Sequence, residues 1–292
     1  MKLVTFSTHD TSPRVGIVTG DQVVDVTAHD PALPARMEDF LEAGAHARSA
    51  AEAALGAGAP RLALAEVVLH APVMRPGKVL AVGLNYADHV EEAGMDRPTI
   101  PMIFNKQSTS VQGPGVPFHL PRVSDKLDYE GELAVVIGRR CRHVPAARAS
   151  EVIAGYTICN DVSVRDWQMR SPTFTMGKSF DTHCPLGPWI VTSDEIADPH
   201  ALRLRTWVND ELRQDSNTKH LIFDCFDLVE HLSTAFTLEP GDVIATGTPG
   251  GVGATMRPRR YLEVGDVVRI GIEGIGELEN AVVPEPESTV VG

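Results

Sequence analysis

The sequence predicts a mainly β fold of the α+β class, and both its composition and its apolar patterning support this. The chain has 292 residues, of which 43% are hydrophobic and 22% charged, as expected of a globular protein. Its 25 glycines and 21 prolines exceed average usage, which indicates many turns between short elements. Several segments also alternate apolar and polar residues, as half-buried strands do. We therefore expect frequent short strands and few helices.

Residues 1–70 are predicted to form a small α+β module. Apolar and polar residues alternate over residues 3–26 around Gly20 and Asp21, which predicts short strands joined by a tight turn. One helix is expected next, because apolar residues between Met37 and Leu55 roughly keep helical spacing. Glycine and proline at residues 56–60 would stop this helix.

Residues 71–292 are predicted to form the main domain. The segment 70–78 contains two prolines and a glycine, and we expect it to be a linker into this domain. Apolar runs rich in β-branched residues predict strands at residues 79–82, 132–137, 155–159 and 204–208.

Charge and cysteine content exclude several classes of function. The 26 Lys and Arg residues against 39 Asp and Glu residues give a formal net charge of −13, which disfavours nucleic acids and anionic membranes as partners. The four cysteines form no CxxC pair, so neither a zinc knuckle nor a disulfide scaffold is expected. The start of the chain has no long apolar core behind its lysine, and no run of about 18 apolar residues occurs. We expect a cytoplasmic protein.

Three carboxylates at strand ends form the most specific local signal. Residues i and i+2 of a strand share a face, so Glu130 and Glu132 in DYEGELAVVIG would project together. A second apolar run ends in Asn-Asp and places Asp161 at another strand end. An all-oxygen site of this kind suits Mg²⁺ or Mn²⁺, and less readily Ca²⁺. The alternative is that these acids are solvated and paired with Arg165 or Lys126.

A histidine and a glutamate share one face of a predicted short helix in GLNYADHVEEAG. Asn85 is the expected N-cap and Gly94 the expected stop. His89 and Glu92 are three residues apart, so the carboxylate can orient the imidazole, as in a general base and its partner. Taken alone, this spacing favours an ordinary surface pair.

A glycine-rich stretch, GDVIATGTPGGVG, spans residues 241–253. It has neither the GK[ST] of a phosphate-binding loop nor an acidic residue at dinucleotide spacing, so NAD and ATP are not expected as cofactors. The stretch predicts either a tight turn or a backbone cradle for a substrate carboxylate, helped by the Thr248 hydroxyl.

A polar segment with Pro172 and Gly177 leads to Lys178. It is either a surface excursion or a connection that returns the lysine to the three carboxylates, where an ammonium would balance negative charge.

Several motifs in one order give the chain a resemblance to a known family. They are GLNYADHVEEAG, DYEGELAVVIG, NDVSVRDWQ, TMGKSFDTHCPLGPWIVT, DSNTKHLIF and GDVIATGTPGGVG, and the resemblance covers Val79 to about Val268. In these motifs the chain resembles the fumarylacetoacetate hydrolase family, and in particular its bacterial acylpyruvases, fumarylpyruvate hydrolases and hydroxymuconate isomerases. The first module also resembles the N-terminal extension of many bacterial members.

This resemblance implies three sets of functional residues. The implied metal ligands are Glu130, Glu132 and Asp161. The implied catalytic residues are His89 and Glu92, which would activate water, and Lys178, which would stabilise an oxyanion. The implied substrate contacts are Lys106, Gln168 and Thr248.

The resemblance also implies an activity. Members act on 2-oxo acids and β-diketones, so we expect a metal-dependent hydrolase that cleaves a C–C bond in an acylpyruvate or fumarylpyruvate through a metal-bound enolate. An oxaloacetate-type decarboxylase and a 5-carboxymethyl-2-hydroxymuconate-type isomerase are alternatives, because the same enolate arises in both. From another class, the chain could be a non-catalytic metal- or ligand-binding protein of this fold. The implied fold is a mixed β-sandwich or barrel-like roll, usually a homodimer.

Overall fold

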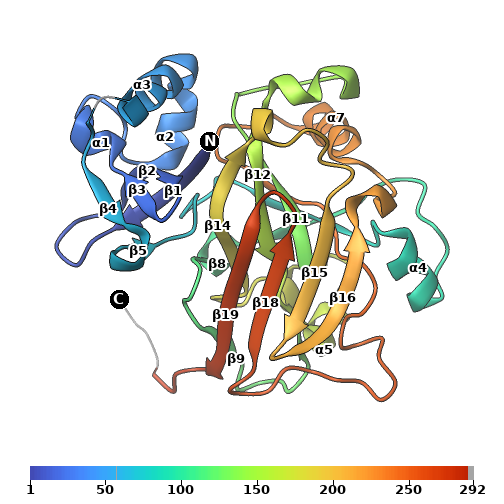
Figure 1. Cartoon of the computed structure of the whole chain (residues 1–292). Coiled ribbons are helices and arrows are strands. Elements are labelled where there is room, and N and C mark those ends of the chain that lie inside the picture. Colours follow the sequence, from blue (N-terminus) through green and yellow to red (C-terminus); the bar gives the residue numbers. More distant parts are fainter. Residues whose placement is uncertain (57, 289–292) are drawn as a thin grey trace.

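Two β-sheets stacked face to face form the body of the protein (Figure 1). The computed structural model describes residues 1–56 and 58–288. The larger sheet has twelve strands, which are β1 (Lys2–Ser7), β2 (Arg14–Thr19), β3 (Gln22–Val24), β4 (Arg61–Ala63), β5 (Val68–Leu69), β6 (Val79–Gly83), β7 (Met102–Lys106), β8 (Val111–Gln112), β11 (Gly131–Ile137), β12 (Ile153–Asn160), β14 (Cys184–Thr192) and β17 (Val243–Ala245). The five-stranded sheet consists of β9 (Phe118–Leu120), β15 (Arg203–Val208), β16 (Glu211–Asn217), β18 (Val267–Ile272) and β19 (Gly276–Pro284). A separate short pair joins β10 (Leu127–Asp128) and β13 (Ser163–Val164).

Short helices fill the connections between these strands. The α-helices are α1 (Val26–His29), α2 (Met37–Glu42), α3 (Gly44–Gly56), α4 (Ala87–Ala93), α5 (Arg165–Gln168), α6 (Thr175–Lys178) and α7 (Cys225–Ala235). The 3₁₀ turns are η1 (Leu64–Glu66), η2 (Ser108–Ser110), η3 (Ala146–Glu151), η4 (Ser193–Glu195) and η5 (Thr218–His220). The prediction of a mainly β fold is confirmed, and in the described part of the chain the sheets stay open rather than closing into a barrel.

Strand β11 is an interior strand of the larger sheet and is buried on both faces. The order of the main path is β4-β3-β2-β1-β14-β12-β11-β17-β6-β7. Leu133, Val135 and Ile137 pack in the core shared with the five-stranded sheet, whereas Val136 packs in the core of the N-terminal module. Burial on both faces explains why this strand is a continuous apolar run instead of an alternating one.

The N-terminal module differs from its prediction at one point. Its strands and the turn at Gly20 are as predicted, but the single predicted helix is two helices, α2 and α3. Gly44, at the first position of α3, has a φ of +61°, a left-handed conformation that glycine adopts without steric cost and that interrupts a continuous helix. The module also shares a sheet with the main body, because β1 pairs antiparallel with β14. The division at residue 70 therefore stays a prediction.

All four strand predictions for the main domain are confirmed, in β6, β11, β12 and β15. The linker at residues 70–78 contains neither helix nor strand. Helix α7 begins with a capping box in which Asp224 and Asp227 bind each other's backbone N–H groups. None of the described helices combines the length and the apolar character needed to cross a membrane.

Candidate active site

The pairing of β11 with β12 brings the three predicted carboxylates together. The two strands are antiparallel with Gly131 opposite Asn160, so Glu130, just before β11, meets Asp161, just after β12. The Asp161 N–H donates to the Glu130 carbonyl over 2.9 Å. Ligand oxygens of Glu130, Glu132 and Asp161 lie within 4.8 Å of one another, and all three residues are buried. These three residues are the acidic cluster.

Two buried lysines neutralise part of the acidic cluster. The Lys178 ammonium, at the end of α6, donates to Glu130 over 2.8 Å and to Asp161 over 2.7 Å. Lys106 donates to the other Asp161 oxygen over 2.6 Å, to the Val162 carbonyl over 3.4 Å and to the Lys178 carbonyl. The segment with Pro172 and Gly177 therefore does return Lys178 to the carboxylates. Lys106, whose three donors are all engaged, is fully buried.

An arginine binds the outer side of the cluster. Arg165 donates to Glu130 over 2.6 Å and to Asp128 over 2.8 Å. The ion pair between the acids and Arg165 that the sequence suggested as an alternative is therefore present. The one with Lys126 is absent from the described chain, because Lys126 pairs with Asp125 at 2.9 Å. Ion pairing and clustering of the carboxylates are therefore both present.

Glu132 has a different environment from Glu130. Its carboxylate accepts from the Gly247 N–H over 2.8 Å and forms no ion pair with a lysine or arginine of the described chain. Burial raises the pKa of Glu132, and the charges of Asp161 and Glu130 raise it further. Burial also acts to raise the pKa of Glu130, but the charges of Lys178 and Arg165 outweigh it and lower that pKa. No lysine or arginine of the described chain therefore compensates a negative charge at the Glu132 end.

This donor set fits a divalent metal ion. Four carboxylates, those of Asp128, Glu130, Glu132 and Asp161, face three cations, those of Lys106, Arg165 and Lys178. An ion bound beside Glu132 would supply a fourth positive charge and allow this carboxyl group to ionise. Carboxylate oxygens at this spacing are typical ligands of Mg²⁺ and Mn²⁺.

Helix α4 holds His89 and Glu92 on one face, near the cluster. Its C-cap is Gly94, as predicted, with a φ of +66°. The predicted N-cap was wrong, because Tyr86 precedes the helix. Asn85 is instead buried, donates to the carbonyls of Phe223 and Thr246 and accepts from the Phe223 N–H. The Asn85 side chain therefore forms hydrogen bonds with backbone groups that are more than 130 residues away in the sequence, and local sequence patterns do not predict such contacts.

The His89 and Glu92 side chains are close but not hydrogen-bonded. The His89 Nδ1 lies 3.6 Å from a Glu92 oxygen, and this nitrogen is buried without a hydrogen-bond partner among the described residues. The Glu92 carboxylate accepts from the Gly251 N–H over 3.0 Å. The neighbouring His89 is the main cause that lowers the pKa of Glu92. Catalytic pairs are often this long without substrate and shorten when it binds.

Two adjoining hollows open beside these groups. The inner hollow, of about 170 Å³, is lined by Glu130, Lys178 and Thr248 among others. The outer hollow, of about 420 Å³, lies next to it. The residues that line both are Leu84, His89, Met95, Arg165, Gln168 and Met169. His89 thus stands on a shared wall rather than on an open surface.

The glycine-rich loop binds carboxylates of the protein itself. The N–H groups of Gly247, Gly251 and Gly253 donate to Glu132, Glu92 and Asp128, in that order, over 2.8 to 3.0 Å. These three amides are therefore engaged, and the predicted cradle for a substrate carboxylate would have to use other groups. The loop instead connects the helix α4 pair to the acidic cluster.

Thr248 and a residue that the sequence did not indicate fix the start of β11. The Thr248 hydroxyl donates to the Gly131 carbonyl over 2.9 Å and accepts from Gln214 over 2.8 Å. Gln214 also accepts from the Gly131 N–H over 3.0 Å. Strand β16 consists almost entirely of polar residues, so its sequence does not indicate that Gln214 is buried. Arg165 was visible in the sequence only as one possible ion-pair partner.

Gln168 packs against the segment that delivers Lys178. Its side-chain oxygen accepts from Arg165 over 3.0 Å, and the residue lines both hollows. Gly177, just before Lys178, lies so close to Gln168 that a Cβ atom there would collide with the Gln168 backbone. The absence of a side chain at Gly177 therefore allows the segment that carries Lys178 to pack directly against Gln168.

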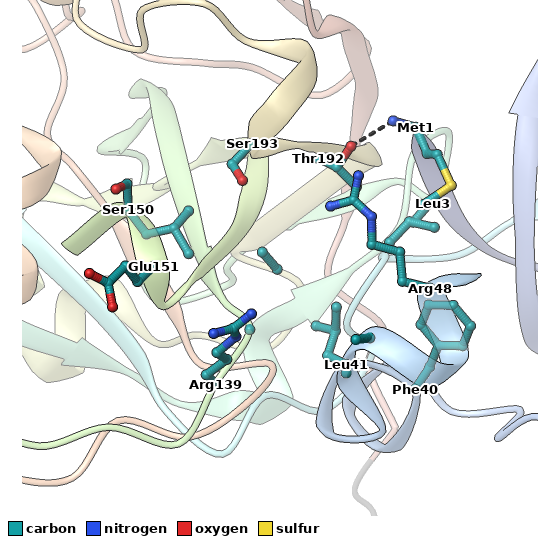
Figure 2. A pocket seen from close by; sticks show the side chains of 15 residues that line it. Met1, Leu3, Phe40, Leu41, Arg48, Arg139, Ser150, Glu151, Thr192 and Ser193 are labelled. Atoms are coloured by element: carbon teal, nitrogen blue, oxygen red, sulfur yellow. Dashed lines mark hydrogen bonds between the residues drawn. The ribbon is translucent and has the colours of Figure 1, made fainter. Parts of the chain in front are cut away.

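A third hollow, of about 330 Å³, lies between the N-terminal module and the main body (Figure 2). Apolar side chains of the module, such as Phe40 and Leu41, form one wall, and Arg139 and Glu151 stand opposite. None of the predicted site residues lines this third hollow.

Comparison with known proteins gives one consistent result. A family model described as fumarylacetoacetate (FAA) hydrolase, C-terminal, matches residues 78–283. The mitochondrial oxaloacetate tautomerase FAHD2A of Homo sapiens is 45% identical over 288 residues, which are 97% of this chain and 92% of the relative.

Two solved structures cover 98% of this chain and 100% of their own chains. The maleylpyruvate hydrolase of Sphingobium sp. SYK-6, in complex with manganese(II) ion and pyruvate, is 37% identical with a TM-score of 0.82. The 5-carboxymethyl-2-hydroxymuconate delta-isomerase of Mycobacterium smegmatis is 42% identical with a TM-score of 0.79. With the family model and the motifs, these matches establish that the chain is an enzyme of the fumarylacetoacetate hydrolase family.

Proposed function

We propose that this enzyme catalyses the keto–enol tautomerisation of a short 2-oxo acid of the oxaloacetate type, with a divalent metal ion as cofactor. One observation supports this most strongly. Glu130, Lys178 and His89 line the same inner hollow, so a candidate metal ligand, a cation and a candidate base all face a bound acid. The human relative named as an oxaloacetate tautomerase supports the substrate class.

The acidic cluster is the proposed metal site. Glu130, Glu132 and Asp161 would hold the ion, and their hard oxygen donors suit Mg²⁺ or Mn²⁺. When bound, such an ion supplies Lewis acidity that favours negative charge on the 2-oxo oxygen.

His89 is the proposed base. In the tautomerisation a proton leaves C3 as the C2–C3 double bond forms, and the 2-oxo oxygen gains a proton to become the enol hydroxyl. Imidazole is the side chain most often used for such transfers, and His89 stands on the wall of the inner hollow. Glu92, 3.6 Å away, would orient the ring.

Lys178 would stabilise the negative charge that develops on the 2-oxo oxygen, an electrostatic contribution commonly worth about 3 kcal/mol. Gln168 and Thr248 line the inner hollow and are the proposed substrate contacts. Lys106 has no donor left for a substrate, so we assign it the positioning of Asp161 in place of the substrate contact expected from the sequence.

Hydrolysis of a C–C bond is the second candidate, and the His89–Glu92 pair favours it. His89 would take a proton from water, and the resulting hydroxide would attack the distal carbonyl of an acylpyruvate or fumarylpyruvate. The C–C bond would then break to give a carboxylic acid and the enolate of pyruvate, which takes up the proton from His89. The maleylpyruvate hydrolase among the similar structures supports this alternative. Decarboxylation of oxaloacetate and metal-dependent binding without turnover remain alternatives to be tested beside it.

One assay separates these activities. Purified protein with Mn²⁺ or Mg²⁺ is mixed with enol-enriched oxaloacetate, and enol absorbance is followed together with pyruvate release. Loss of enol absorbance without pyruvate, faster than in buffer and abolished by chelation, is the expected result. Pyruvate release would indicate decarboxylation. The same protein is also mixed with acylpyruvate or fumarylpyruvate. Cleavage of these acids, without faster conversion of enol to keto oxaloacetate, would show that the enzyme is a C–C hydrolase and not a tautomerase. Tight binding without turnover would favour the non-catalytic alternative. A homodimer, a cytoplasmic location and the lack of nucleic-acid or membrane partners stay predictions.

A further inference from the structure

Gly131 lies between two of the candidate metal ligands, Glu130 and Glu132, so its two peptide groups orient both of them. On one side β11 pairs with β12. On the other side β17 pairs with residues 134–136 of β11 and ends before it reaches Gly131. The backbone N–H and C=O groups of Gly131 therefore need partners from elsewhere in the fold.

A glutamine and a threonine take the place of the missing strand. The Gln214 side-chain oxygen accepts from the Gly131 N–H over 3.0 Å, and the Thr248 hydroxyl donates to the Gly131 carbonyl over 2.9 Å. The Gln214 amide nitrogen donates to the Thr248 hydroxyl over 2.8 Å and to the Pro249 carbonyl over 2.9 Å. Because a backbone N–H only donates and a carbonyl only accepts, these contacts fix one orientation of the Gln214 amide. Side chains from β16 and from the glycine-rich loop thus hold both peptide groups of Gly131.

A β-bulge in the five-stranded sheet turns Gln214 toward β11. Thr206 of β15 pairs with Gln214, but the next residue, Trp207, pairs with Leu212, so Arg213 is an extra residue in β16. In a regular strand Leu212 and Gln214 would share a face. With the extra residue they face opposite sides, so Leu212 is 47% exposed and Gln214 only 1%. The bulge therefore exposes an apolar side chain and buries a polar one, which burial of apolar surface alone would not favour.

The five-stranded sheet also packs directly on the Gly131 backbone. A Cβ atom at Gly131 would collide with the Thr206 hydroxyl and would lie 3.2 Å from the Gln214 side-chain oxygen. Gln214 is not among the residues that line the inner or the outer hollow. Its effect on Glu130 and Glu132 must therefore pass through the backbone between them.

We propose that Gln214 is a positioning residue that holds Glu130 and Glu132 in the geometry a divalent metal ion needs, and that the bulge at Arg213 places its amide for this purpose. The inference rests on the metal site of the proposed function and adds a residue to it. Groups that orient metal ligands without touching the metal typically contribute about 10-fold to 100-fold to metal affinity.

The test measures Mn²⁺ affinity by titration calorimetry without substrate, together with the electron paramagnetic resonance spectrum of the bound ion. Gln214→Met keeps a side chain of similar length but leaves the Gly131 N–H without its acceptor. We expect Mn²⁺ to bind about 10-fold to 100-fold more weakly, with an altered spectrum because the ligand geometry changes.

Thr206→Ala is the matched control. This side chain packs on the same glycine, but its hydroxyl has no hydrogen-bond partner in the described part of the chain. The variant should lose stability through lost packing and keep the Mn²⁺ affinity and spectrum of the wild type. Thr248→Val is a second test, because it removes the hydroxyl that donates to the Gly131 carbonyl, and without substrate its proposed role as a substrate contact does not enter. It should also weaken Mn²⁺ binding.

Weaker binding and an altered spectrum in Gln214→Met, with both unchanged in Thr206→Ala, support the proposal. A Gln214→Met protein that unfolds at lower urea but binds Mn²⁺ like the wild type would overturn it, as would equal losses of affinity in Thr206→Ala. If Gln214→Met does not fold, Thr248→Val decides by the same measurements. A wild type that does not bind Mn²⁺ would overturn this role together with the metal site. A wild type that binds Mn²⁺ without accelerating the enol–keto conversion of oxaloacetate would refute the proposed activity alone, and the affinities would still decide the role of Gln214.

Discussion

The acidic cluster and the His89–Glu92 pair lie beside the same inner hollow but are built in opposite ways. The cluster lies where β11 meets β12, its residues are at most 6% exposed, and Lys106 and Lys178 bind it at 2.6 to 2.8 Å. The pair lies on a helix of seven residues, with side chains 13% and 32% exposed and 3.6 Å apart.

This difference separates two tasks. Strand register and buried ion pairs hold the carboxylates in one geometry, as a metal site requires. A short helix at the edge of the hollow leaves the imidazole ring free to shift. A general base needs this freedom, because its hydrogen bonds shorten when substrate binds. Substitutions in the cluster should therefore affect folding, metal binding and activity together, whereas substitutions in the pair should affect activity alone.

The largest effect is expected when a cluster carboxylate is neutralised. Asp161→Asn would leave Lys106 and Lys178 without their charged partner, and breaking a buried pair typically costs about 3–5 kcal/mol of unfolding free energy. Activity should become undetectable and Mn²⁺ affinity should fall, with the same direction in Glu130→Gln. Calorimetry and urea unfolding measure both, and Glu91→Gln on the exposed side of α4 is the control. Full activity after chelation would contradict a metal site.

His89→Ala should separate the two regions most clearly. Loss of a general base typically lowers the rate by about 100-fold to 10,000-fold, while metal affinity and stability stay near those of the wild type. Steady-state kinetics and Mn²⁺ titration on one preparation provide the measurement. Turnover equal to the wild type would show that the pair is an ordinary helix surface contact.

Gly177→Ala tests whether the position of Lys178 depends on close packing. The new methyl group would meet the Gln168 backbone, and overpacking of this kind typically costs about 1–3 kcal/mol. We expect lower stability and a drop in kcat with little change in Mn²⁺ affinity. Thr173→Ala, at an exposed position of the same segment, serves as the comparison. A variant with unchanged kcat and stability would mean that the segment adapts freely.

The smallest effect is a pH dependence that contrasts Glu132 with Glu130. Because burial and then the charges of Asp161 and Glu130 raise the pKa of Glu132, the folded state holds its proton more tightly than the unfolded state. The metal-free protein should therefore lose stability as pH rises above the ordinary value of 4.5 and through the raised pKa. Melting temperatures of chelated protein measured across pH test this.

Two comparisons sharpen that result. Glu132→Gln should flatten the pH dependence, because it removes the titrating group. Mn²⁺ should raise the melting temperature of the wild type most at high pH, since an ion that binds the folded state stabilises it by mass action. A chelated wild type whose stability rises with pH over this range would show that other groups dominate.

The sequence by itself determined the features that depend on local spacing. Alternating and apolar runs predicted β6, β11, β12 and β15, and the spacing of two residues placed Glu130 and Glu132 on one face. Gly94 ended α4 as predicted, because glycine adopts the left-handed conformation of a helix end without a steric penalty. The order of the motifs indicated the family, which the comparisons confirmed.

The tertiary structure decided which distant groups meet. Asp161 reaches the glutamates through strand register, and Gln214, 83 residues from Gly131, fixes the start of β11. The tertiary structure also decided that the glycine-rich loop binds carboxylates of the protein itself. Asn85 is buried and joins the backbone at Phe223 to the backbone at Thr246. Residue periodicity reports only on neighbours along the chain, whereas ion pairs and backbone contacts between remote segments follow from how the sheets and loops pack. The sequence therefore supplied the reactive groups, and packing decided which of them face one another.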